Sequence, residues 1–150
     1  MGDNIEKHPK QFTEIIEAGH SLGNHTFNHL IGWNTNTEEY LENTRRCQNA
    51  IEKYAGVQAK KLFRPPHGRI SRKQIALLRS DYEIVMWTYL TGDFDLALNK
   101  EKCLKNAIVQ SEALDIVVFH DSLKAYNKLA YVLPEFLKHF SQLGFQFKAI

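Results

Sequence analysis

Residues 115–121 read D-I-V-V-F-H-D, and this stretch decides the fold. From Ile116 to Phe119 the run is continuously apolar and rich in β-branched side chains, as strands buried on both faces are. Strands of that kind belong to parallel sheets whose two faces are covered by helices. The stretch therefore predicts an α/β protein with a parallel sheet.

Outward from this run, extended segments alternate with helical patterns along the chain. The expected strands are His20–Asn24, Leu62–Arg64, Glu83–Trp87, Asp115–Phe119 and Phe145–Ala149. The expected helices run from Pro9 to Ala18, from the N-cap Thr37 to Gly56, from the N-cap Ser71 to Arg79, from the N-cap Asn99 to Ala113, and from Ala125 to Leu143. Pro134 should kink or divide the last helix. No linker or repeat interrupts the alternation, so we expect one domain over residues 1–150, with right-handed crossovers.

Composition and charge narrow the class of protein. With 43% hydrophobic and 24% charged residues the chain is typical of a globular domain rather than a disordered or fibrous one. A net charge of +2 does not indicate nucleic acid as a partner. No apolar run reaches the roughly 20 residues that a membrane span needs. Cys47 and Cys103 lie far apart and make no CxxC pair, so we expect two buried free thiols.

Four clusters of residues suited to catalysis follow predicted strands. They are His25–His29, Arg64–Arg69, Asp93–Asp95 and Phe119–Asp121. In a parallel α/β barrel the functional groups gather at the C-terminal ends of the strands and in the loops after them. The shared placement of the four clusters therefore predicts a site.

The first cluster suggests a metal. On a helical turn, His25 and His29 would point to one side with their Cβ atoms about 5–6 Å apart, which suits chelation of one divalent ion. Ordinary histidines at a helix start are the competing interpretation. A zinc site needs at least a third protein ligand, which this pair does not supply.

The other clusters suggest an arginine clamp and a proton-transfer group. Arg64 is followed by two prolines that fix the backbone, so it is presented rigidly to a carboxylate, and the N–H of His67 is placed to donate to an oxyanion. The alternative is a rigid turn with a surface arginine. His120 is placed for proton transfer near neutral pH, although a core histidine is the common explanation of a lone case. Asp93 and Asp95 either orient His120 or belong to an acidic turn.

Taken in order, these clusters resemble the second to fifth motifs of the polysaccharide deacetylase family, also known as the NodB homology domain or carbohydrate esterase family 4. The H-[ST]-x-x-H motif is matched by His25, Thr26 and His29, R-x-P-x-G by Arg64, Pro66 and Gly68, and L-x-H by Val118, Phe119 and His120, with valine in place of leucine. The D-x-x-D-W motif is met in part, since Asp93 aligns with its second aspartate and Phe94 replaces the tryptophan. The resemblance covers essentially all 150 residues.

The resemblance implies a fold and a set of roles. The fold is a parallel (β/α) barrel of the distorted seven-stranded deacetylase type. His25 and His29 are implied as ligands of a divalent metal, usually zinc, and Arg64 as the residue that holds the catalytic base. The remaining roles are oxyanion and substrate binding by His67, Pro66 and Val118, and general-acid catalysis by His120 oriented by Asp93.

The family's first motif, T-F-D-D-G, supplies the catalytic base and the third metal ligand, and it does not occur in these 150 residues. The region around Asp3 and Asn4 resembles the segment after the second strand of the family. We therefore expect a fragment or a misplaced start codon, an open barrel without its first strands, and self-association through the open side. The first residues hold no apolar signal core, and an extracytoplasmic or cell-envelope location is expected if the native N-terminus lies upstream.

The function implied is that of a metal-dependent hydrolase that removes acetyl groups from N-acetylated glycans such as peptidoglycan or chitin-like oligomers, with this chain alone expected to be inactive. Two alternatives stay open. One is a different zinc hydrolase whose third ligand is Asp93, Asp95 or His120. The other is a non-catalytic glycan-binding or interaction module derived from the same family.

Overall fold

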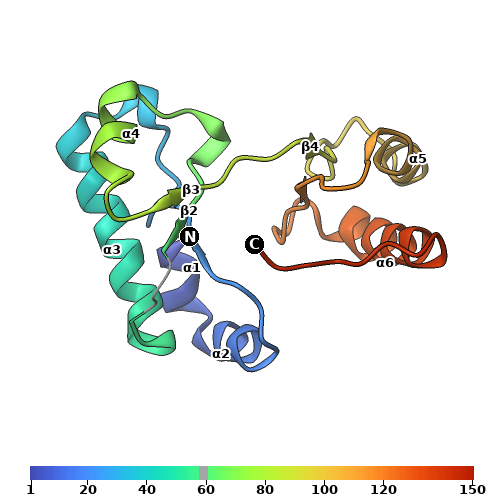
Figure 1. The fold of residues 1–150 in the computed structure, drawn as a ribbon, viewed down its shortest axis with the longest axis horizontal. Helices are drawn as coiled ribbons and strands as arrows, with labels where there is room; N and C mark the ends of the chain where they lie inside the picture. The colour runs from blue at the N-terminus through green and yellow to red at the C-terminus, as the bar shows by residue number, and fades with distance from the viewer. Residues whose placement is uncertain (58–60) are drawn as a thin grey trace. The chain divides into compact units, whose positions relative to one another are not determined.

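The computed structural model describes residues 1–57 and 61–150. It divides into two compact units, Met1–Met86 with Ala149–Ile150, and Trp87–Lys148 (Figure 1). The expectation of one domain over the whole chain stays a prediction. Parallel strands alternate with helices in both units, which confirms the predicted α/β class, and no closed barrel forms within the described residues.

The first unit is built around a three-stranded parallel sheet in the order β1-β2-β3. Its elements are α1 (Gly2–Lys7), α2 (Pro9–Glu17), β1 (Gly23–Asn24), the 3-10 turn η1 (Gly32–Asn34), α3 (Thr37–Ala55), β2 (Leu62–Phe63), the 3-10 turn η2 (Pro66–Gly68), α4 (Arg72–Leu78) and β3 (Glu83–Ile84). Asn24 lies opposite Phe63, and Phe63 opposite Ile84. The helices α3 and α4 connect successive strands, as parallel pairing requires.

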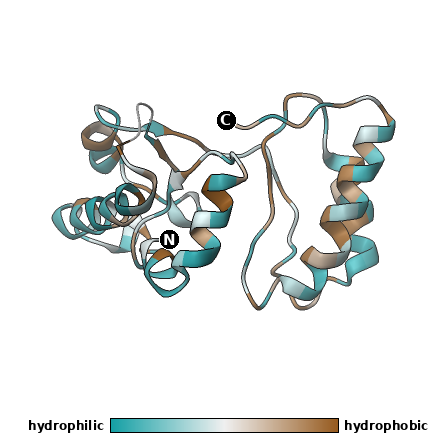
Figure 2. Ribbon diagram, turned by 90° about the horizontal axis from the view of Figure 1, so that it is seen from below, coloured by the Kyte–Doolittle hydropathy of each residue, from teal (hydrophilic) through white to brown (hydrophobic). Residues whose placement is uncertain are grey.

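The core of the first unit consists of two apolar clusters that share α3. One contains Cys47 and Ile51 of α3 with Phe27, and the other contains Tyr40 of α3 with Phe63. In Figure 2 the helices alternate between hydrophobic and hydrophilic residues, as amphipathic helices do. The helix α3 therefore contributes side chains to the whole core of this unit.

The second unit pairs two parallel strands with two helices. Its elements are β4 (Tyr89–Leu90), α5 (Lys100–Gln110), β5 (Val117–Val118) and α6 (Tyr126–Gln142), with Tyr89 opposite Val117. The helices α5 and α6 lie side by side (Figure 1) and enclose a core of Ala107, Phe136 and Phe140. Among the described residues, no helix is long and apolar enough to cross a membrane.

Helix caps were predicted closely. The capping box of Ser71 and Gln74 forms, and Asn99 caps α5. The prediction of two buried free thiols is also confirmed, at Cys47 and Cys103. The cap of α3 is Asn36 rather than Thr37, because Asn36 is extended and its side-chain oxygen accepts the Glu39 N–H at 2.9 Å.

Several predicted elements differ from the structure. Residues 145–149 form no strand, because apolar alternation makes a strand only beside a partner, and within the described chain none pairs with them. Residues 116–119 are half-buried rather than fully buried, since the sheet of their unit has only two strands. The helix α6 continues through Pro134 and is not divided. The six-residue helix α1 was not predicted, because it is too short to show a period.

Candidate active site

The loop after β1 carries the predicted metal ligands. The ring centroids of His25 and His29 lie 4.9 Å apart, so the two imidazoles are neighbours as predicted. The prediction that a helical turn brings them together is wrong. Residues 25–30 are not helical, and the backbone of Thr26 and of His29 is left-handed, with φ of 60° and 58°. Such backbone strain in non-glycine residues gathers at functional sites.

Buried polar side chains hold this strained loop in place of helical hydrogen bonds. The Asn24 Oδ1 accepts the Thr26 N–H at 3.0 Å. The Asn43 Oδ1, on α3, accepts the N–H of Phe27 at 2.8 Å and of Asn28 at 2.9 Å. Side-chain acceptors of this kind compete with helix formation. Sequence reasoning missed Asn24 and Asn43, and the one signal for Asn43 was a polar residue on the buried face of an amphipathic helix.

The protonation of His25 is set by its surroundings. Its Nδ1 lies 2.6 Å from the carbonyl oxygen of Arg64, which can only accept, so Nδ1 carries the proton. Burial lowers the pKa of His25 to about 4, against the opposing effect of that hydrogen bond and with a further lowering by His29. The ring is therefore neutral near pH 7, and its lone pair is on Nε2. This is the tautomer in which metal-binding histidines are held by a carbonyl behind them.

The donor set fits part of a metal site. His25 and His29 offer two adjacent imidazoles, and the ring of His67 lies 4.8 Å from that of His29. Over residues 1–57 and 61–150, no group of three or more His, Cys, Asp and Glu side chains is arranged to hold a metal ion. His25 and His29 therefore fit as two ligands of a metal ion. Within the described residues, no further ligand is grouped with them.

The guanidinium of Arg64 is bound to backbone carbonyl groups. The Nε of Arg64 donates to the Val85 carbonyl at 3.2 Å and one terminal nitrogen donates to the Met86 carbonyl at 3.1 Å, so the guanidinium is fixed beyond the end of β3. Burial lowers the pKa of Arg64. Pro66 is fully buried, and His67 is exposed with a left-handed φ of 56°. Binding of a carboxylate by Arg64 and of an oxyanion by His67 stay predictions.

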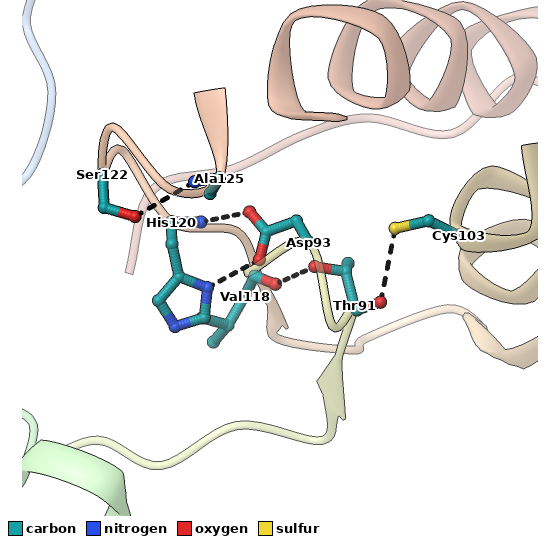
Figure 3. A network of polar contacts seen from close by, with 7 residues as sticks. All are labelled: Thr91, Asp93, Cys103, Val118, His120, Ser122 and Ala125. Atoms are coloured by element: carbon teal, nitrogen blue, oxygen red, sulfur yellow. Dashed lines mark hydrogen bonds and ion pairs between the residues drawn. The ribbon is translucent and has the colours of Figure 1, made fainter. Parts of the chain in front are cut away.

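In the second unit, His120 and Asp93 form a close pair (Figure 3). Asp93 is fully buried, and its Oδ1 lies 2.7 Å from the His120 Nδ1 while its Oδ2 accepts the His120 backbone N–H at 2.6 Å. Burial opposes ionisation of Asp93, but these two hydrogen bonds and the charge of His120 outweigh it, and the pKa of Asp93 is lowered. The carboxylate is ionised near neutral pH and keeps a proton on Nδ1, and the second ring nitrogen points away from it (Figure 3).

The structure distinguishes the two interpretations of Asp93 and Asp95, which were that they orient His120 or that they belong to an acidic turn. Asp95 is exposed and its Oδ1 accepts the Ala97 N–H at 2.9 Å, so it belongs to a turn, whereas Asp93 orients His120. Val118 is half-buried, and its carbonyl accepts the Thr91 hydroxyl at 2.8 Å, which fixes the strand end from which His120 projects (Figure 3). A pocket for an acetyl group beside Val118 stays a prediction.

Comparison with known families identifies the chain. The family model described as polysaccharide deacetylase matches residues 1–84, more than half of the sequence. The protein therefore belongs to the polysaccharide deacetylase family, as its motifs predicted.

Individual relatives agree with this membership. A peptidoglycan-N-acetylglucosamine deacetylase of Bacillus cereus is 26% identical over all of the chain and 70% of its own length. Chitin deacetylase 2 of Saccharomyces cerevisiae is 28% identical over 87% of the chain and 44% of its own length. The chain thus spans only part of the length of each of these relatives.

Solved structures show the same fold. A peptidoglycan N-acetylglucosamine deacetylase in complex with 4-naphthalen-1-yl-N-oxidanyl-benzamide superposes with a TM-score of 0.92 at 24% identity, over 100% of this chain and 70% of that one. A pseudoenzyme of carbohydrate esterase family 4 from Bacillus anthracis superposes with a TM-score of 0.78 at 17% identity, over 93% of this chain and 49% of that one. The fold of the chain is therefore that of the deacetylase domains, which are (β/α) barrels.

Proposed function

We propose that this chain carries groups of a metal-dependent hydrolase that removes acetyl groups from N-acetylated glycans. The observation that carries the proposal is the state of His25, neutral, fixed from behind by the Arg64 carbonyl and adjacent to His29. A pair of imidazoles in this state is suited to a divalent ion, and zinc is our first candidate. When bound, such an ion supplies polarisation of the amide carbonyl and activation of water.

The proposed role of His120 is to deliver a proton to the leaving amine. Its support is the fully buried carboxylate of Asp93, which accepts from Nδ1 at 2.7 Å and so leaves proton exchange to Nε2. A histidine held in one tautomer by a carboxylate is a common general acid and base. Asp93 acts on the reaction through His120 and is a positioning residue.

The proposed substrates are glycans that contain N-acetylglucosamine, as in peptidoglycan or chitin-like oligomers. The support is family membership and the names of the relatives, which are peptidoglycan and chitin deacetylases. Arg64 is proposed to hold a carboxylate, the His67 N–H to bind the oxyanion, and Pro66 and Val118 to shape the substrate pocket.

Self-association of the chain also stays a prediction, which light scattering tests.

The experiment measures acetate released from an N-acetylglucosamine pentamer and from peptidoglycan, with zinc or with a chelator. Because the T-F-D-D-G motif does not occur in these residues, the chain is tested both as it is and extended by such a segment from a family member. We expect release by the extended chain, dependent on zinc and lost in His25→Ala and His120→Ala. Release unaffected by chelation would contradict metal dependence.

A second candidate is a glycan-binding module without turnover. Two observations favour it. The T-F-D-D-G motif does not occur in these residues, and within the described residues no group of three or more His, Cys, Asp and Glu side chains is arranged to hold a metal ion. The existence of a pseudoenzyme with this fold is consistent with it. Binding of the pentamer together with no acetate release, even by the zinc-loaded extended chain, would favour this candidate.

A further inference from the structure

Trp33 is an exposed aromatic side chain on the loops of the candidate site. It lies in η1, and 66% of the residue is exposed to solvent. The indole contributes little to either apolar cluster of its unit. Tryptophan is a highly buried residue on average, and its large ring offers an apolar face together with a polar N–H.

The exposed ring is nevertheless anchored. Its Nε1–H donates to the Ile70 carbonyl at 2.9 Å, which restrains the orientation of the indole. The guanidinium of Arg69 lies 5.7 Å from the ring centre, within the range of a cation–π contact. A side chain held in one orientation before a ligand arrives loses less entropy on binding.

The backbone beneath Trp33 is also tightly held. The Gly32 N–H donates to the Arg69 carbonyl at 2.9 Å, and the Gln74 Nε2 donates to the Gly32 carbonyl at 3.0 Å. A Cβ on Gly32 would lie only 2.6 Å from the Gln74 Oε1 and 2.7 Å from the Arg69 oxygen, so only glycine allows this approach. The loops after β1 and β2 are therefore fastened to each other at Trp33.

One of these two loops carries the proposed metal ligands His25 and His29, and the other carries His67, whose N–H is proposed to bind the oxyanion. Trp33 follows His29 by four positions, and its anchor Ile70 follows His67 by three. The rings of His29 and His67 are themselves in contact, with centroids 4.8 Å apart. The fixed indole thus stands on the same pair of loops as the groups proposed to act on the acetamide.

We propose that Trp33 is a stacking platform for a sugar ring of the glycan, a binding subsite beside the metal-site histidines. The proposal rests on the proposed function, since it names the part of the site that holds the chain of sugars. One face of a pyranose ring presents C–H groups, which are attracted to the negative face of an indole. Arg69 lies over one face of the indole, so the opposite face is the one proposed to receive the sugar.

The experiment measures binding of an N-acetylglucosamine pentamer by calorimetry and by tryptophan fluorescence. The chain contains two tryptophans, so Trp87→Phe leaves Trp33 as the only indole and makes its fluorescence a direct report. We expect the pentamer to change the emission of Trp33, and Trp33→Ala to weaken binding about tenfold. Trp33→Phe keeps an aromatic face but loses the anchor to Ile70, and we expect an intermediate loss.

The control variant is Ile15→Ala, which truncates an exposed apolar side chain on α2, and it should bind as the unmodified chain does. Equal affinity of Trp33→Ala and the unmodified chain for the pentamer would overturn the inference. So would the absence of pentamer binding by both chains, when their circular dichroism spectra show that both are folded. Failure of the proposed function shows differently, as no acetate release by the zinc-loaded extended chain or as release that does not depend on zinc or His25. The two readouts therefore distinguish the failure of one from the failure of the other.

Discussion

Replacing Asp93 by asparagine tests how the buried carboxylate controls His120. In the protein, Asp93 accepts from the His120 Nδ1 at 2.7 Å and from its backbone N–H at 2.6 Å. An amide has only one acceptor atom. If that oxygen keeps the backbone N–H, the amide nitrogen faces Nδ1 and donates to it, so the imidazole proton must move to Nε2.

The magnitude is set by the two hydrogen bonds. Each bond to an ionised acceptor contributes about 2 kcal/mol, against about 1 kcal/mol for a neutral one, so Asp93→Asn should lower the free energy of unfolding by about 2 kcal/mol. The protonated ring would place N–H groups against the amide N–H₂ and is therefore disfavoured. In a chain that releases acetate, we expect a loss of about 10²- to 10⁴-fold in rate.

The tautomer is measured by long-range ¹H–¹⁵N correlation spectra of the imidazole nitrogens, and stability by urea unfolding. Asp121→Asn is the matched control, because Asp121 follows His120 directly but is exposed. We expect the proton on Nδ1 in the unmodified protein and in the control, and on Nε2 in neutral Asp93→Asn. An Nδ1 proton retained in Asp93→Asn would refute the reasoning.

Three further predictions concern the loops of the first unit. His25 is neutral in the fold because burial lowers its pKa from 6.5 to about 4, so the unfolded chain binds the extra proton and stability should fall by about 3 kcal/mol as the pH drops through this window. Urea unfolding of the metal-free chain measures the slope, which His25→Phe should lack. Asn43→Ala removes the side-chain acceptor that the Phe27 and Asn28 N–H groups share, while Phe27 keeps the Asn43 backbone carbonyl at 3.2 Å. We therefore expect a loss of about 1–3 kcal/mol and faster hydrogen exchange, above all at the Asn28 amide. Gly32→Ala places a Cβ 2.6 Å from a neighbouring side-chain oxygen, so we expect a loss of about 1–3 kcal/mol in thermal unfolding.

Matched variants make these outcomes specific. Asn49 is exposed on the same helix as Asn43, and Asn49→Ala should leave hydrogen exchange in the loop unchanged. A Cβ on Gly23 would meet only atoms 3.5 Å away or more, so Gly23→Ala should cost less than Gly32→Ala. The His25 argument is contradicted if His25→Phe keeps the same dependence of stability on pH. The Asn43 argument is contradicted if hydrogen exchange at the Asn28 amide is as slow in Asn43→Ala as in the unmodified chain. Equal melting temperatures of Gly23→Ala and Gly32→Ala would contradict the argument about Gly32.

Local signals predicted the elements of this fold well. The capping box at Ser71, the cap at Asn99 and the alternation of strands with helices are written into neighbouring residues, and each is present. Residues 145–149 show the limit of such reasoning, because a strand depends on a partner that the local pattern does not contain. The fate of an alternating segment is thus decided elsewhere in the chain.

The site shows the same division between local and tertiary causes. The spacing of His25 and His29 predicted that the imidazoles are neighbours, but through a helical turn that does not form. The loop is shaped instead by Asn24 and by Asn43, which lies on a helix 15 or more positions away. That long-range hydrogen bond, like the choice of Asp93 over Asp95 as the partner of His120, required the structure.

The central claim is that His25 serves a metal-dependent deacetylation of glycans. Its most direct test is acetate release from an N-acetylglucosamine pentamer by the chain extended with a T-F-D-D-G segment, compared between the parent and His25→Ala in the presence of zinc. We predict release by the parent that a chelator abolishes and that His25→Ala lowers at least about 100-fold. No release by the zinc-loaded parent, or equal release by His25→Ala, would contradict the claim.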